Sequence, residues 1–373
     1  RCEVLDSMGD RFQLTVYDPS YRPPRWFGEG ITYNIFPDRF CRDRDPVQPE
    51  GEGIAPRVLH ENWDDLPVYC PDEHGEILNN DFFGGTLRGV LSKLDYFESL
   101  HVRTLYFNPI FQAYSNHRYD TGDYKRIDPL LGNEEDFKTL CSEAAKRGMR
   151  VVLDGVFNHV GRGFWAFRDV QEKKWDSPYK DWVHISFEGN SNYNDGFWYE
   201  GWEGHYELVK LNLRNPDVVH HLFDCIRLWK EEFGIDGLRL DVAYCLDKDF
   251  LRQLRAFCDS FGSDFFLVGE LLHGDYNQFV GDGLLHSCTN YECYKGLYSS
   301  MNSYNLFEIT HSLLRQFGPE NWTLYRGKHL LSFVDNHDVT RVASILQNRR
   351  HLPLIYALLF GMPGIPCIYY GSE

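Results

Sequence analysis

Acidic residues stand at the ends of four short apolar runs in the sequence. Asp154 lies in the second half of one such run, Asp241 directly follows another, and Glu270 and Asp338 come a few positions after two more. One acidic residue at such a place is more often a helix cap or a solvated loop residue. Four of them, at strand ends that would share one edge, indicate a common site. Grouped carboxylates could cleave glycosidic bonds, because the oxocarbenium-like transition state needs a carboxylic acid at the leaving oxygen and a carboxylate at the anomeric carbon.

The neighbours of these residues predict a division of roles. Arg239 precedes Asp241 by two positions, so both side chains lie on one strand face and the cation favours an ionised nucleophile at Asp241. Glu270 follows an apolar run, and burial near other carboxylates would let it hold a proton at neutral pH, as a general acid must. A retaining mechanism would place the two carboxyl groups about 5 to 5.5 Å apart. The remaining polar residues of these motifs would bind sugar hydroxyls: Asp338, His159 and His337.

A regular alternation of strands and helices would position these motifs. The strand-like apolar runs are 31–36, 104–107, 151–156, 237–240, 265–268, 284–289, 329–334 and 365–370. The helical patterns are 87–100, 134–147, 217–233, 248–261, 306–317 and 352–360. Strands that alternate with helices form parallel sheets through right-handed crossovers. Eight such strands predict a (β/α)8 TIM barrel, an α/β fold.

Spacing between the motifs indicates an insertion. A βα unit takes roughly 30 residues, which fits the interval from Asp241 to Glu270, whereas the interval from Asp154 to Asp241 holds nearly two further units. This surplus is rich in Trp, Tyr, Asn and Gly, as expected for a lobe over a cleft, and 41–80 is a second surplus, expected to be a long loop. We predict a tail and linker (1–25), a barrel (26–159 and 216–373) and an inserted lobe (160–215). We also expect the chain to be a fragment that lacks both the last barrel helix and the C-terminal β domain.

Composition narrows the choice of partners. The 373 residues include 55 Asp and Glu against 38 Lys and Arg, a formal net charge of −17. Such an acidic chain is a poor partner for nucleic acid or an anionic membrane surface. Aromatic residues make up 16% of the chain, and their rings suit either sugar stacking or an aromatic-rich core. The 10 cysteines show no paired spacing, which is typical of reduced thiols in a cytoplasmic protein.

Taken together and in order, these motifs resemble the conserved regions of the α-amylase family of glycoside hydrolases. The stretches 115–124 and 209–212 are similar to those of its neopullulanase, cyclomaltodextrinase and maltogenic amylase branch. The resemblance implies a TIM barrel, Asp241 as nucleophile, Glu270 as acid/base and Asp338 as transition-state stabiliser. It implies Tyr119 as the ring under the cleaved sugar, and Asp154 as a partner of Arg239. It places further substrate-binding residues around them: His117, His159, Arg239, His273, His337 and Arg341.

The chain departs from that branch in three places. Tyr244 and Cys245 stand where Asn-Glu is usual, and Leu272 replaces a Trp, so the acceptor-side preference is open. Family members that bind calcium use an Asp after paired glycines, whereas this chain has the uncharged Thr86. We therefore predict no cofactor and no metal, with a weak calcium site at the nearby aspartates as the alternative: Asp43, Asp45 and Asp81.

The resemblance implies a retaining hydrolase of α-1,4-glucosidic bonds in maltooligosaccharides, cyclodextrins, pullulan or starch. Two alternatives remain: a transglycosylase that uses the same residues, and a non-catalytic glucan-binding relative. Trp198, Tyr199 and Trp202 could be sugar platforms or the core of the lobe. We also expect a bacterial cytoplasmic location, and the resemblance suggests a possible homodimer of the full-length protein.

Overall fold

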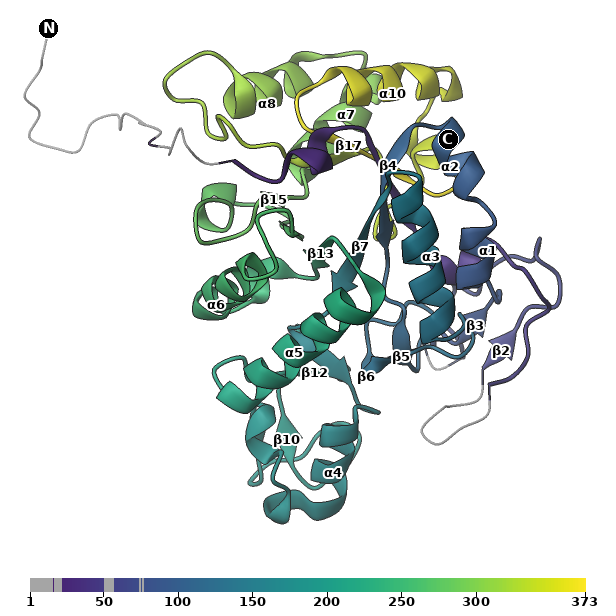
Figure 1. Ribbon diagram of the computed structural model, residues 1–373, viewed down its shortest axis with the longest axis vertical. Helices are drawn as coiled ribbons and strands as arrows, with labels where there is room; N and C mark the ends of the chain where they lie inside the picture. Colours follow the sequence, from purple (N-terminus) through teal and green to yellow (C-terminus); the bar gives the residue numbers. More distant parts are fainter. Residues whose placement is uncertain (1–15, 17–21, 50–56, 74, 76) are drawn as a thin grey trace, which may run out of the picture.

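Eight parallel strands form the centre of the protein, which is described here by a computed structural model of residue 16 and residues 22–49, 57–73, 75 and 77–373 (Figure 1). The strands are β1 (Ile31–Ile35), β4 (Val102–Phe107), β7 (Arg150–Gly155), β13 (Gly237–Leu240), β14 (Phe266–Gly269), β15 (Ser287–Cys288), β16 (Leu331–Phe333) and β17 (Ile365–Tyr369). Their order in the sheet is β15-β14-β13-β7-β4-β1-β17-β16, and a parallel bridge between Thr289 and Leu331 joins the two ends. The predicted TIM barrel is confirmed, with all eight strands at the predicted places.

Alternation along the strands decides which side chains enter the barrel. Tyr106, Val152, Phe266 and other apolar side chains fill its interior, while the neighbouring residues on each strand pack outward against the helices. At the carboxyl ends of β7 and β13 the inward series continues with polar residues. Val152 is followed two positions later by Asp154, which pairs in register with Arg239 on the next strand. Strand geometry therefore places this carboxylate beside this cation.

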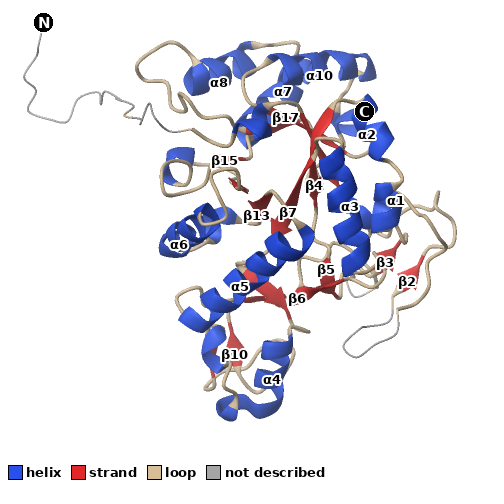
Figure 2. Ribbon diagram, viewed as in Figure 1, coloured by secondary structure: helices blue, strands red, loops and turns tan. Residues whose placement is uncertain are grey.

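Helices surround the barrel, as Figure 2 shows in blue. They include α1 (Leu87–Leu91), α2 (Leu94–Ser99), α3 (Glu134–Lys146), α5 (Pro216–Leu228), α6 (Lys248–Asp259), α8 (Phe307–Phe317) and α10 (Leu352–Gly361). All six helical patterns predicted from the sequence are present, the first as the two short helices α1 and α2. Three helices were not predicted: α4 (Trp165–Lys173), α7 (Tyr291–Ser303) and the short α9 (Val342–Ile345).

Between β7 and α5 the chain forms a lobe below the barrel in Figure 1. It contains β8 (His159–Gly161), α4, β9 (Ile185–Ser186), β10 (Trp198–Tyr199), β11 (Gly201–Trp202) and β12 (His205–Lys210). β12 pairs antiparallel with both β8 and β11. The segment predicted as an insertion thus has sheets and a helix of its own, on buried side chains that include Trp182, Phe197 and Tyr199.

Two further loops reach the carboxyl edge of the barrel. After β1, the predicted long loop contains β2 (Val58–Leu59), which pairs with β3 (Asp81–Phe82). After β4, β5 (Phe111–Ala113) and β6 (Thr121–Ile127) form a hairpin whose connection carries residues 115–120. Most of the predicted tail and linker, 1–25, lies outside the described residues.

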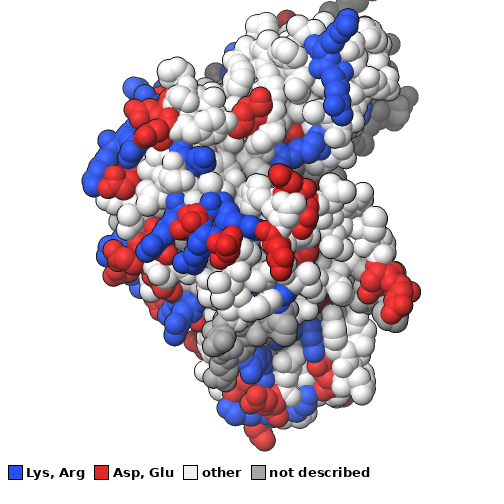
Figure 3. Space-filling view, turned by 90° about the vertical axis from the view of Figure 1, so that its right-hand side faces the viewer, with Lys and Arg blue, Asp and Glu red and all other residues white. Residues whose placement is uncertain are grey.

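The surface charge of the protein and the hydropathy of its helices agree with the amino-acid composition. Basic and acidic side chains are interspersed on the face shown in Figure 3, so positive charge is not gathered there. Within the described residues, no helix combines the length and the apolar character that crossing a bilayer requires.

Candidate active site

One buried guanidinium connects three carboxylates at the carboxyl end of the barrel. Arg239 Nη1 lies 2.9 Å from Asp154 Oδ1 and 2.9 Å from Asp241 Oδ1, and its Nη2 lies 2.8 Å from Glu270 Oε1. All four side chains are buried. Asp154 comes from β7, Arg239 from β13, and the other two directly follow β13 and β14. The structure therefore brings the nucleophile and acid candidates to one cation, together with the predicted Arg239–Asp154 contact.

This sharing changes the expected protonation of the site. Burial raises the pKa of Asp241 well above its usual value, and the charges of Glu270 and Asp154 raise it further, while Arg239 lowers it. Burial likewise raises the pKa of Asp154, against the effect of Arg239. From the sequence we expected Arg239 to keep Asp241 ionised, because only one ion pair was considered. In the structure this one cation contacts three carboxylates. Burial and the neighbouring carboxylates therefore oppose the ionised forms of Asp241 and Asp154, and the shared cation offsets this only in part.

A row of rings forms the barrel side of the site. The Tyr119 ring stacks on His337 at 5.5 Å and 11°, and its hydroxyl donates to Asp154 Oδ2 at 2.7 Å. Asn108 donates to His337 Nδ1 at 3.1 Å, which leaves Nε2–H of His337 to donate to the Tyr119 oxygen, 2.7 Å away. His117 continues the row, 5.8 Å from the Tyr119 ring. We call His337, Tyr119 and His117 the barrel row.

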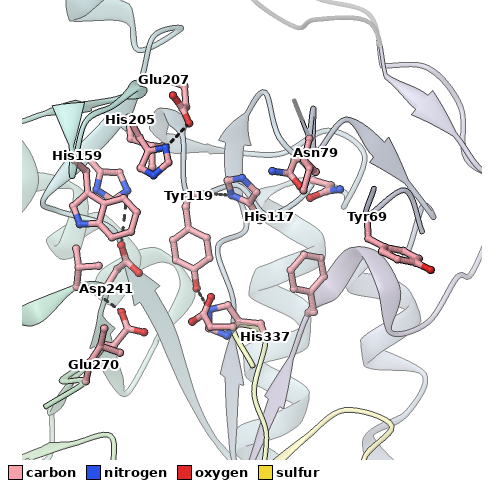
Figure 4. A pocket seen from close by; sticks show the side chains of 18 of the residues that line it. Tyr69, Asn79, His117, Tyr119, His159, His205, Glu207, Asp241, Glu270 and His337 are labelled. Carbon is pink, nitrogen blue, oxygen red and sulfur yellow. Dashed lines mark hydrogen bonds and ion pairs between the residues drawn. The ribbon is translucent and has the colours of Figure 1, made fainter. Parts of the chain in front are cut away.

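Both histidines beside the carboxylates are neutral. Burial lowers the pKa of His159 to about 3, and burial together with Arg239 lowers that of His337 to about 4. Asn158 donates to Nδ1 of His159, so Nε2 carries the proton. This Nε2 is buried, has no hydrogen-bond partner within the described residues, and lies 3.8 Å from Asp241 Oδ2 (Figure 4). It is an unsatisfied donor at the place where a substrate hydroxyl would bind.

A cavity of about 670 Å³ opens above these groups, a volume typical of small-ligand sites. Figure 4 shows Asp241, Glu270 and Tyr119 at its base, with His205 and Glu207 of the lobe on one side and Tyr69 and Asn79 on the other. Both surplus segments of the sequence therefore contribute walls, as predicted for the lobe; for the long loop after β1 this is an additional finding. Composition alone did not indicate which of their side chains would face the cavity.

Comparison with known proteins agrees with this geometry. Residues 34–373 match the sequence profile described as "Alpha amylase, catalytic domain". The chain belongs to the α-amylase family. It is 34% identical over 367 residues to the intracellular maltogenic amylase of Bacillus subtilis and 35% identical over 364 residues to neopullulanase 2 of Thermoactinomyces vulgaris. These matches cover 97% and 95% of this chain but only 58% and 57% of the relatives.

Solved structures resemble the chain over the same extent. The cyclic α-maltosyl-(1→6)-maltose hydrolase of Arthrobacter globiformis, in complex with cyclic α-maltosyl-(1→6)-maltose, superposes with a TM-score of 0.77 at 32% identity. The match covers 94% of this chain and 75% of that one. The family resemblance drawn from the sequence is thereby confirmed, including the neopullulanase and maltogenic amylase branch.

Three residues expected from the α-amylase resemblance differ in their exposure to the cavity. Asp338 lines it, with about half of its side chain exposed and Oδ2 3.1 Å from His337 Nε2. His273 is exposed and does not line the cavity, where Leu272 stands instead. Arg341 also lies outside the lining, because its guanidinium packs over Tyr369, 4.3 Å from the ring centroid. Arg341 therefore holds the end of β17 in this structure.

The three aromatic residues of the lobe have different surroundings. Tyr199 is fully buried in the core of the lobe. Trp198 is 38% exposed, and its indole donates to the Tyr206 hydroxyl. Trp202 lines the cavity. Only Trp202 is placed to contact a sugar.

Two of the three aspartates considered for calcium, Asp43 and Asp81, have other partners. Asp81 is buried and accepts from Asn116 Nδ2 at 2.9 Å and from the Val68 N–H at 3.0 Å. Asp43 accepts from the Thr86 hydroxyl at 2.6 Å. Across the part of the chain that the structure describes, no three His, Cys, Asp or Glu side chains gather as a metal site. The carboxylate oxygens of Asp43 and Asp81 that a cation would need are therefore used in hydrogen bonds.

The hydroxyl of Tyr119 offers a first test of this geometry. Tyr119→Phe keeps the ring but removes the donor to Asp154 and the acceptor for His337, leaving both buried groups short of a partner. We expect the free energy of unfolding to fall by about 1–3 kcal/mol, measured by urea denaturation. The matched control is Tyr114→Phe, because the Tyr114 side chain is half exposed. Equal stability of the two variants would contradict the assigned hydrogen bonds.

Proposed function

We propose that the protein is a retaining glycosidase that hydrolyses α-1,4-glucosidic bonds in maltooligosaccharides, cyclodextrins, pullulan or starch. The observation that carries this proposal is the contact of one buried guanidinium with both Asp241 and Glu270 at the base of the cavity. Family membership supports it, since the relatives carry the names maltogenic amylase and neopullulanase. The same intact pair speaks against a non-catalytic glucan-binding role.

The first step makes a glycosyl-enzyme. The Asp241 carboxylate attacks the anomeric carbon, while the Glu270 carboxylic acid gives its proton to the glycosidic oxygen, and the bond to the leaving sugar breaks. Arg239 contacts both groups. It can therefore stabilise the negative charge on Asp241 before the step and on Glu270 after it. Burial of two neighbouring carboxyl groups opposes the ionisation of both at once, which suits this step, because one carboxyl must be ionised and the other protonated.

In the second step water attacks the anomeric carbon and passes its proton to the Glu270 carboxylate. The ester bond breaks and Asp241 becomes a carboxylate again. His159 is a neutral N–H donor whose unpartnered Nε2–H can hold a sugar hydroxyl beside Asp241, whereas the N–H of His337 is already donated to the Tyr119 oxygen. Asp338 adds a carboxylate at the open side of the cavity.

The stereochemistry and range of the reaction test this proposal. We expect proton NMR of early reaction mixtures to show the α-anomer of the product, because two displacements retain configuration. Parallel product profiles on maltoheptaose, β-cyclodextrin and pullulan would identify the preferred substrate. A β-anomeric first product, or no turnover of any of the three, would refute the proposed function.

We further propose a cytoplasmic location and activity without a metal cofactor. The first is supported by the Bacillus relative, which is named an intracellular enzyme. The second is supported by the bonded state of Asp43 and Asp81. Unchanged activity after dialysis against EDTA is the expected result. A possible homodimer of the full-length protein remains a prediction that sedimentation would test.

A further inference from the structure

One buried carboxylate contacts three separate segments of the cavity wall. Asp81, on the short strand β3, is only 1% exposed. Its Oδ2 accepts from the Val68 N–H at 3.0 Å, and its Oδ1 accepts from Asn116 Nδ2 at 2.9 Å and lies 3.8 Å from Arg39 Nη2. These three partners line the cavity, whereas Asp81 does not. A residue behind the cavity wall therefore joins three segments that form the wall.

A histidine completes the surroundings of this carboxylate. His60 Nε2 lies 3.1 Å from Asp81 Oδ2, and His60 Nδ1 lies 3.2 Å from Asp65 Oδ2. The His60 ring stacks on Phe83 at 4.1 Å, and the His60 carbonyl accepts from Arg42 Nη2 at 2.9 Å. A buried carboxylate is costly unless its oxygens are hydrogen-bonded. Both oxygens of Asp81 have partners, so the side chain is held in one orientation.

The wall in front of Asp81 needs such an anchor. Val68 and Tyr69 line the cavity, but their side chains are 53% and 68% exposed. Side chains this exposed bury little apolar surface, which leaves little to offset the entropy lost when their backbone is fixed. A hydrogen bond from the Val68 N–H to a buried acceptor fixes it instead. We call the cavity-lining residues on this side the retained-side wall: Arg39, Val68, Tyr69, Asn79 and Asn116.

The chemistry decides which part of the substrate meets this wall. A general acid protonates the oxygen that leaves, so the leaving sugar lies beside Glu270. The cleaved sugar lies at Asp241, over the Tyr119 ring. Figure 4 shows Tyr69 and Asn79 on the far side of Tyr119 from Glu270. Glucosyl units that stay attached to the cleaved sugar, away from the bond that breaks, therefore extend toward the retained-side wall.

We propose that Asp81 is a positioning residue that sets how strongly the enzyme prefers substrates with further glucosyl units behind the cleaved sugar. This inference rests on the proposed function. Asp81 does not line the cavity, so it acts through the Val68 backbone and the Asn116 side chain. Without its carboxylate the three joined segments lose their common acceptor. Contacts to the retained glucosyl units then weaken, while the cluster around Arg239 keeps its geometry.

Glycosyl fluorides of two lengths test this role, because fluoride replaces the leaving sugar in both. α-Glucosyl fluoride carries only the cleaved sugar, whereas α-maltotriosyl fluoride adds two units on the retained side. Asp81→Asn keeps the shape of the side chain but turns one acceptor atom into a donor that faces other donors. We expect it to lower the ratio of kcat/KM on maltotriosyl fluoride to kcat/KM on glucosyl fluoride by about 10-fold, with most of the change in KM. Turnover of glucosyl fluoride should stay near the parent value.

The matched control is Asp65→Asn, the same change at the other carboxylate beside His60. The Asp65 side chain is 42% exposed and does not line the cavity, so this variant should keep the parent ratio. Equal loss on both fluorides at an unchanged Tm, or an unchanged ratio in Asp81→Asn, would overturn the inference. Failure of the parent protein on both fluorides would instead refute the proposed function.

A second pair of variants decides the matter if Asp81→Asn lowers the Tm. Val68→Pro removes the N–H that donates to Asp81, whereas Val68→Ala shortens the same side chain and keeps the N–H. We expect Val68→Pro to lower the ratio of the two fluorides well below that of Val68→Ala. Equal ratios for these two variants would show that the hydrogen bond to Asp81 does not position the wall.

Discussion

Replacement of Asp241 by Asn should abolish turnover while leaving the fold intact. The amide keeps the shape of the side chain but cannot form the ester, so kcat on maltotriose should fall by about 10⁴-fold or more, as for other catalytic nucleophiles. Stability should be unchanged or higher at neutral pH. Burial raises the pKa of Asp241, so its ionised form is destabilising in the folded state, and Asn removes that cost. Steady-state kinetics and calorimetric Tm values check both expectations.

Two comparisons sharpen this test. Asp95→Asn makes the same change at a highly exposed carboxylate that pairs with Arg147, and it should leave kcat unaltered. Titration of maltotriose into Asp241→Asn should still show binding, because the barrel row remains. Residual activity above about 1% of the parent would remove Asp241 from the role of nucleophile.

Strand positions were predictable because a buried parallel strand leaves a short apolar run in the sequence. The missed helix α7 shows the limit of this reasoning. Tyr291–Ser303 is rich in Tyr and Ser and contains Gly296, so its intrinsic helix propensity is low. Packing supplies the missing stability: a Cβ on Gly296 would lie 3.2 Å from Ile309 Cα, so glycine permits the close approach of α8.

The same limit separates the site residues that the sequence could place from those that it could not. Asp154, Arg239, Asp241 and Glu270 could be placed together because strand alternation and parallel order bring strand ends to one edge. Trp202 could not be told from Trp198, because its direction depends on a hairpin turn and on the docking of the lobe. The raised pKa of Asp241 was also missed, since its direction depends on burial and on how many carboxylates surround one cation.

The largest effect on stability is expected at Arg239. Arg239→Met removes the only cation in contact with three buried carboxylates in the described cluster, and such unpaired buried charges cost about 3–5 kcal/mol. Activity should be lost as well, because Asp241 and Glu270 lose their common partner. Arg239→Lys is the matched control: it restores one positive charge but not the planar fork that reaches all three groups, so its stability should be intermediate.

The pH dependence of this loss follows from the direction of the pKa shifts. Burial already raises the pKa of Asp154 and Asp241 above 3.8, and loss of Arg239, which lowers both, would raise them further. A carboxyl with a raised pKa binds more protons in the folded than in the unfolded state, so stability falls as pH rises from the usual carboxyl pKa through the raised one. The deficit of Arg239→Met relative to the parent should therefore grow from pH 5 to pH 8. Calorimetric Tm values across this range measure it, and parallel pH profiles for the two proteins would show that Arg239 does not control the charge of the cluster.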